Sequence, residues 1–113
     1  MSRLISSVVV SYQVRPEAVV EHVRLIKAIF EQLQAERPGN VEYKVMCLED
    51  GVSFVHVSTA DTPDESNPLP ELASFRQFGQ GLATRVATPP VPAAAEIIGS
   101  YQPAGPALGT VRG

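Results

Sequence analysis

His56 is the residue of this sequence whose type and position best suit chemistry. It lies in the middle of an alternating, β-branched stretch, between Val55 and Val57. An imidazole changes its charge near neutral pH and can serve as a general base, a proton donor or a ligand contact. His56 is therefore our candidate for a catalytic acid–base group. The alternative is a hydrogen-bonded histidine in an interface.

Four further residues are candidates for ligand contacts. The two-residue period of a strand places Ser11 and Gln13 on one side of residues 8–14, and it places Phe54 beside His56. Glu96 could form an acid–base pair with His56, although another strand separates them in the expected sheet. The alternative for Glu96 is a solvated charge on an edge strand, where charge discourages pairing with other sheets.

The other histidine and the cysteine do not complete a metal site. His22 lies in an expected helix and is interpreted as a surface histidine, on the other side of the sheet from His56, so the two rings have no metal-ligand spacing. Cys47 is the only cysteine, which excludes an internal disulfide. We interpret it as a small buried hydrophobe on the helix side of its strand. No metal and no cofactor are expected.

Six elements must position these residues. Apolar residues recur three and four positions apart in two segments, which predicts helices there. β-branched and alternating stretches predict strands, and Glu49-Asp50-Gly51 favours a tight hairpin between two of them. The expected strands are 8–14, 41–48, 52–58 and 94–101, and the expected helices are 16–36 and 70–86.

This βαββαβ order predicts an α+β, ferredoxin-like fold. Two crossover helices cover one face of a four-stranded antiparallel sheet, with the first and third strands in the centre. The other face, assigned Val9, Met46 and the side chains around His56, is too apolar to be left in water. We expect a homodimer formed through this open sheet face, enclosing a partly polar cavity for a small organic ligand.

Length and charge narrow the classes of partner. The 113 residues suit one domain, expected over 1–101, with 102–113 as a flexible C-terminal tail. Nine basic and 12 acidic residues give a net charge of −3 with no basic block, so neither a nucleic acid nor an anionic membrane is expected as partner. No segment approaches the roughly 20 apolar residues of a membrane-spanning helix, and the expected location is cytoplasmic.

The RNA-recognition fold shares this element order, so RNA binding is an alternative function to be weighed. Its third strand carries a basic residue and stacking aromatic residues. Here Asp50 takes the basic position, and Val52 and Val57 take two aromatic positions. Both phosphate attraction and base stacking are mostly missing, so RNA binding is not expected.

Three segments carry a resemblance to a known superfamily. They are VVVSYQVRPEAVVEHVRLIKAIF, LEDGVSFVHVST and FRQFGQGLATRVATPPVPAAAEIIGSY, which together cover most of residues 8–101. They resemble the dimeric α+β-barrel superfamily, typified by the antibiotic-biosynthesis-monooxygenase-like proteins. Oxygenases of that family use Trp and Asn residues in their cavity. This sequence has no Trp, and Asn40 and Asn67 fall in expected loops, so no catalytic residue is carried over.

Two functions remain open at this stage. The first is a cofactor-independent enzyme, monooxygenase-like or isomerase-like, in which His56 exchanges protons and Ser11 and Gln13 contact a small organic molecule. The second is a non-enzymatic protein, either a small-molecule binder or a structural dimer module.

Overall fold

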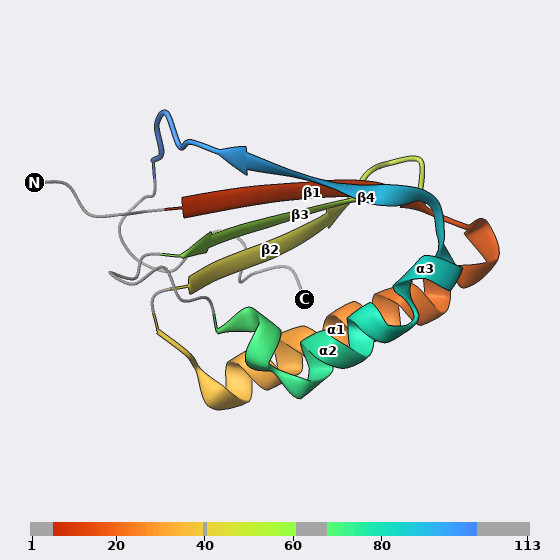
Figure 1. Ribbon diagram of the computed structural model, residues 1–113, viewed down its shortest axis with the longest axis horizontal. Coiled ribbons are helices and arrows are strands. Elements are labelled where there is room, and N and C mark those ends of the chain that lie inside the picture. Colours follow the sequence, from red (N-terminus) through yellow and green to blue (C-terminus); the bar gives the residue numbers. More distant parts are fainter. Residues whose placement is uncertain (1–5, 40, 61–67, 102–113) are drawn as a thin grey trace, which may run out of the picture.

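The computed structural model describes residues 6–39, 41–60 and 68–101 of the chain. A four-stranded antiparallel sheet forms one layer and the helices form the other (Figure 1). The ferredoxin-like order expected from the sequence is confirmed. The elements are β1 (Ser6–Val14), η1 (Pro16–Ala18), α1 (Val19–Glu36), β2 (Val41–Cys47), β3 (Ser53–Ala60), η2 (Leu69–Glu71), α2 (Ala73–Gln80), α3 (Leu82–Arg85) and β4 (Val86–Ala95).

The sheet has the order β2-β3-β1-β4, so the first and third strands are central, as expected. The β2–β3 hairpin turns at Gly51, whose φ of 79° is one that side chains rarely tolerate. Asp50 fixes the turn because its Oδ1 accepts the backbone N–H groups of Val52 and Ser53, at 2.9 and 2.8 Å. This hairpin sets the register that brings the residues of β2 beside those of β3.

Helix α1 packs a wide face on the core. Its buried residues are His22, Leu25, Ile26 and Ile29, and the partly buried Val19, Val23, Phe30 and Leu33 pack against the same core. The helix ends at Arg37, which adopts a left-handed conformation and donates its N–H to Leu33 O. His22 is completely buried, and its interpretation as a surface histidine was wrong.

The second half of the chain departs most from the expected boundaries. The single helix expected over 70–86 is divided into η2, α2 and α3. The last strand occupies Val86–Ala95 and not 94–101. Pro89, Pro90 and Pro92 lie outside both expected elements but belong to β4, which is an edge strand with one unpaired side, where a missing N–H is tolerated. Where the β1–β4 register shifts, the Thr88 hydroxyl accepts the Gln13 N–H and so keeps this backbone donor paired.

The face assigned to β3 was also wrong. Phe54 and His56 point towards the helices and are only 2% and 7% exposed. Val55 and Val57 take the opposite face. The sequence argument gave the helix side to the aliphatic residues, whereas the core uses larger rings there. The assignment of Ser11 and Gln13 to the open face was correct, and both are exposed.

Expectations for Cys47, for the C-terminal residues and for membrane-spanning segments can also be compared with the structure. Cys47 is exposed at the last position of β2, so its expected burial was wrong. The tail expected over 102–113 lies outside the described residues. Within the described part of the chain, no helix is long and apolar enough to cross a membrane.

Candidate active site

His56 lies at the centre of a hydrogen-bonded group that joins three strands. In the register, Tyr12 on β1 faces Phe54, and Tyr43 on β2 faces Ser58. Both tyrosines are therefore diagonal neighbours of His56 on the same sheet face, within reach of long side chains. The Tyr12 hydroxyl lies 2.5 Å from His56 Nε2, and the Tyr43 hydroxyl lies 2.7 Å from His56 Nδ1.

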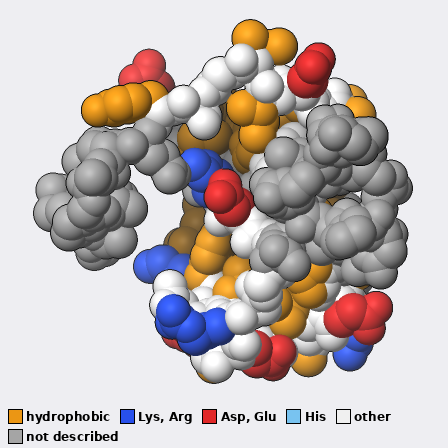
Figure 2. Space-filling view, turned by 90° about the vertical axis from the view of Figure 1, so that its left-hand side faces the viewer, with side chains coloured by type: hydrophobic (Ala, Val, Ile, Leu, Met, Phe, Trp, Pro, Cys, Tyr) orange, Lys and Arg blue, Asp and Glu red, His pale blue; other side chains and the backbone are white. Residues whose placement is uncertain are grey.

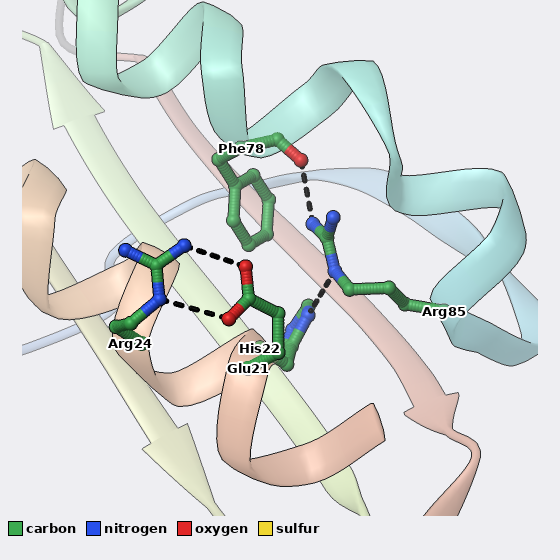
Figure 3. Close-up of polar contacts among 5 residues, drawn as sticks. All are labelled: Glu21, His22, Arg24, Phe78 and Arg85. Atoms are coloured by element: carbon green, nitrogen blue, oxygen red, sulfur yellow. Dashed lines mark hydrogen bonds and ion pairs between the residues drawn. The ribbon is translucent and has the colours of Figure 1, made fainter. Parts of the chain in front are cut away.

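The helices extend this group to a buried cation. His22, in the first turns of α1, places Nε2 2.6 Å from the Tyr12 hydroxyl. Arg85, the last residue of α3, donates from Nε to His22 Nδ1 at 3.0 Å and from Nη2 to the Phe78 carbonyl oxygen at 2.5 Å. Figure 3 shows Arg85 reaching between His22 and Phe78. We call the five side chains Arg85, His22, Tyr12, His56 and Tyr43 the relay.

Aromatic rings pack tightly around the relay. His22 contacts the rings of Phe54 and Phe78 with centroids 4.8 and 5.1 Å apart. The Phe78 ring also lies under the Arg85 guanidinium, at 5.1 Å, in a cation–π contact. Among the described residues Arg85 forms no ion pair with a carboxylate. Its charge is held by a carbonyl oxygen, an imidazole and a ring face.

Burial sets the protonation states of the relay. Desolvation lowers the pKa of His56 to about 4, and desolvation, with help from the Arg85 charge, lowers the pKa of His22 to about 4. Burial raises the pKa of both Tyr12 and Tyr43. At neutral pH the relay therefore consists of two neutral imidazoles and two neutral phenols beside one guanidinium.

The relay ends at a cleft between the sheet and the helices, of about 330 Å³. Its polar lining comes from Tyr12, Tyr43, His56 and Ser58, and the rest is apolar. Figure 2 views one end of the molecule, where hydrophobic side chains show between charged side chains of both signs. The apolar lining consists of Val8, Val10, Leu69, Pro70, Phe75, Phe78, Gly79, Leu82 and Pro90.

The structure does not bring the five residues expected at the site together. His56 and Phe54 lie on the helix side. Ser11 and Gln13 lie on the opposite sheet face, in a shallow groove with Thr88. Glu96 lies beyond the end of β4 and is exposed. The pairing of Glu96 with His56 is therefore wrong, since one residue has left the sheet and the other is buried beneath it.

Four relay members were missed by sequence reasoning, and three of them left a signal. His22 recurs with Leu25, Ile26 and Ile29 at three- and four-residue spacing, which indicates a buried position. Tyr12 and Tyr43 share the parity of core residues in their strands. Arg85 gave no signal of its own, because a single arginine after two glycines is usually on the surface. Among the described residues, no group of three or more His, Cys, Asp or Glu could hold a metal ion.

Solved structures of other proteins share this fold. No protein-family model and no curated sequence matches the chain. Among solved structures, a Nitrosomonas europaea protein provisionally described as an antibiotic biosynthesis monooxygenase has a TM-score of 0.70 at 17% identity, over 87% of this chain and 94% of that one. The chain has the fold of the antibiotic-biosynthesis-monooxygenase-like proteins.

Two further structures support this assignment of the fold. A Bacteroides thetaiotaomicron protein of the same provisional description has a TM-score of 0.71 at 12% identity, over 83% of this chain and 90% of that one. The Rv0793 protein of Mycobacterium tuberculosis has a TM-score of 0.68 at 13% identity, over 88% of this chain and 100% of that one. The superfamily resemblance expected from the sequence is confirmed at the level of the fold.

Proposed function

We propose that the cleft binds a small, largely apolar organic molecule with an oxygen-bearing group, and that the relay exchanges a proton with that group. The chain would then be a cofactor-independent acid–base enzyme. The observation that carries the proposal is that a continuous row of five hydrogen-bonded side chains ends at the polar wall of an apolar cleft. Such clefts, with a few convergent polar groups, are the usual form of small-molecule sites.

The cleft suits this chemistry because it combines an apolar lining with a few polar groups. Hydrogen bonds are stronger in such a low-dielectric site than in water, and the lining excludes competing solvent. Tyr43 and His56 both line the cleft and are bonded to each other, so a proton that leaves the Tyr43 hydroxyl for a ligand oxygen can be replaced from His56. Monooxygenase-like and isomerase-like reactions both include a proton transfer at an enol, phenol or carbonyl group.

Binding can be tested with a panel of bicyclic aromatic ketones, phenols and hydrocarbons, followed by protein-observed NMR. We expect the shifted resonances to surround His56, Tyr43 and Phe75. Gly79 lines the cleft, and a Cβ built there meets nothing within 4 Å. Gly79→Leu should therefore fold and block binding, while Gly79→Ala keeps it. Binding that survives Gly79→Leu would contradict the location.

Catalysis can be tested by deuterium exchange of the α-carbon hydrogens of 1-tetralone in D₂O, which is enolisation without an assumed physiological substrate. We expect the protein to accelerate exchange by donating from Tyr43 to the ketone oxygen while the α-hydrogen leaves to the solvent, and we expect His56→Gln to remove the acceleration. Exchange at the uncatalysed rate, despite binding, would favour the second function.

The second function is a non-enzymatic small-molecule binder. It is favoured by one observation: both ring nitrogens of His56 are already occupied by tyrosine hydroxyls. In that case the relay only stabilises the core and offers one hydroxyl to the ligand. Binding would then persist in His56→Gln, and no exchange would be measured.

We also propose a homodimer formed through the open sheet face. Met46, Leu48 and Val91 are 45%, 49% and 62% exposed, and Val55 and Val57 are half-buried between them in the register. A sheet face this apolar favours a partner. The molar mass from light scattering coupled to size-exclusion chromatography should be twice that of the chain, and Val57→Lys should halve it.

The cytoplasmic location expected from the sequence stays a prediction.

A further inference from the structure

The relay has a fixed direction, and Arg85 sets it. A guanidinium has N–H donors and no acceptor. Its Nε donates to Nδ1 of His22, so Nδ1 carries a lone pair. A neutral imidazole has one N–H, and that of His22 must therefore be on Nε2, which points at the Tyr12 hydroxyl.

The same reasoning passes through the two central residues. The Tyr12 oxygen accepts the His22 N–H, and its own single hydrogen must go to the other partner, Nε2 of His56. Since Nε2 of His56 is then the acceptor, its hydrogen is on Nδ1. That Nδ1–H donates to the Tyr43 oxygen.

Tyr43 is the end of the row. Its oxygen accepts from His56, so its own hydrogen is free to donate. In the described part of the chain, His56 is the only hydrogen-bond partner of this hydroxyl. Tyr43 and His56 both line the cleft, so the remaining donor is presented at the cleft wall.

We infer that the cleft selects ligands that present an acceptor oxygen, of the ketone or quinone class, to the Tyr43 hydroxyl, and that Arg85 is the positioning residue that sets this preference. This inference rests on the proposed binding of a small molecule in the cleft. It adds the chemical class of the ligand and the residue that determines it. Arg85 does not line the cleft and acts only through His22.

Reversal of the row is costly because it leaves the Tyr12 hydrogen without a protein acceptor. If the Tyr43 hydroxyl donated to His56 Nδ1, then His56 Nε2 would carry a hydrogen. The Tyr12 oxygen would receive two N–H groups, and its own hydrogen would have no acceptor among the described residues. Tyr12 also lines the cleft, but it is only 5% exposed and its ring packs on that of Phe54, so an unpaired donor there is unfavourable.

The tautomers can be measured directly on the wild-type protein. Two-bond ¹⁵N–¹H correlation spectra at pH 7 distinguish the protonated from the unprotonated nitrogen of each histidine. We expect the hydrogen on Nε2 of His22 and on Nδ1 of His56. A hydrogen on Nε2 of His56 would overturn the inference, whether or not any ligand binds.

The variant Arg85→Met tests whether Arg85 sets the tautomers of the two histidines. With the donor removed, the His56 tautomers should become a mixture. Arg24→Met is the matched control, because Arg24 is an exposed arginine that pairs with Glu21 and forms no hydrogen bond to a relay residue (Figure 3). An unchanged His56 tautomer in a folded Arg85→Met protein would overturn the role of Arg85. If that variant does not fold, the wild-type spectra and the ligand test still decide the direction.

Ligand class can be tested with 1-tetralone and tetralin, which differ by one carbonyl oxygen. We expect 1-tetralone to bind about three- to tenfold more tightly to the wild type, as one hydrogen bond would give. The two should bind equally to Tyr43→Phe. Equal binding of both probes to the wild type would overturn the acceptor preference and leave small-molecule binding intact. If neither probe binds, the proposed function loses its support, and the tautomer measurement decides the direction of the relay.

Discussion

Arg85 and His22, which are 63 positions apart in the chain, join the two helical segments of the molecule. The Nε of Arg85 lies 3.0 Å from His22 Nδ1, and both residues are buried. This contact ties the end of α3 to the first turns of α1, directly above the sheet. A buried cation is tolerated here because three groups, His22, the Phe78 carbonyl and the Phe78 ring, replace its water.

Arg85→Met should lower the free energy of unfolding by about 2–3 kcal/mol, since it leaves His22 Nδ1 and the Phe78 carbonyl without a donor. The measurement is urea denaturation at pH 7. Arg24→Met, the exposed control, should leave the midpoint almost unchanged. Equal midpoints for the two variants would show that the buried contact contributes nothing.

Tyr12→Phe should destabilise the fold more than Tyr43→Phe. The first variant leaves both His22 Nε2 and His56 Nε2 without a partner, at a cost of about 2–4 kcal/mol for two groups. The second leaves only His56 Nδ1 without a partner and should cost about 1 kcal/mol. Urea midpoints of the two variants give the order, and the reverse order would contradict the central position of Tyr12.

Stability should fall as the pH is lowered from about 6.5 towards 4. Burial lowers the pKa of His22 and His56 to about 4 in the folded state, whereas the unfolded chain titrates near 6.5. The unfolded state therefore binds more protons in this window, and stability is lost by up to about 1.4 kcal/mol per pH unit for each histidine.

The test of this pH dependence is a set of urea titrations between pH 7 and 5, where the carboxylates remain ionised. His56→Gln should remove about half of the slope. A stability that does not change over this range would show that the histidines are not held neutral by burial.

Gly51→Ala should cost about 1–2 kcal/mol, because the positive φ of 79° at this turn is strained for any side chain. Gly39→Ala is the matched control, since its Cβ would also meet nothing within 4 Å and no positive φ is required there. Thermal or urea unfolding compares the two. A Gly51→Ala protein as stable as the wild type would mean that the hairpin can adopt another turn.

The element order and the strand order could be predicted from the sequence because they depend on periodicity and on the hairpin signal at Asp50-Gly51. The face of β3 could not, because both parities are apolar: Val55 and Val57 on one side, Phe54 and His56 on the other. The choice depends on the volume beneath the helices, which rings fill better than valines. The last strand was misplaced because three prolines indicate a linker unless the strand is known to lie at an edge.

His56 was the correct starting point for the site, but its surroundings were assigned to the wrong face. A histidine that is hydrogen-bonded on both sides needs partners from other elements. Tyr12, Tyr43 and His22 become its neighbours only through the sheet register and the docking of α1. Arg85 depends on the break between α2 and α3 at Gly81, where a Cβ would lie 3.0 Å from the guanidinium. Contacts of this kind follow from tertiary packing and not from local pattern.

The prolines of β4 also limit how copies of this chain could join through their sheet edges. Three of the ten residues of β4 are prolines, so this edge strand has fewer N–H groups to offer to another strand. Head-to-tail addition, with the β2 edge of one copy on the β4 edge of the next, would repeat without end and build a filament. The prolines obstruct that route, and pairing between two β2 edges closes on itself after two copies. Growth into fibres is thus disfavoured by the same three residues that concealed the strand in the sequence.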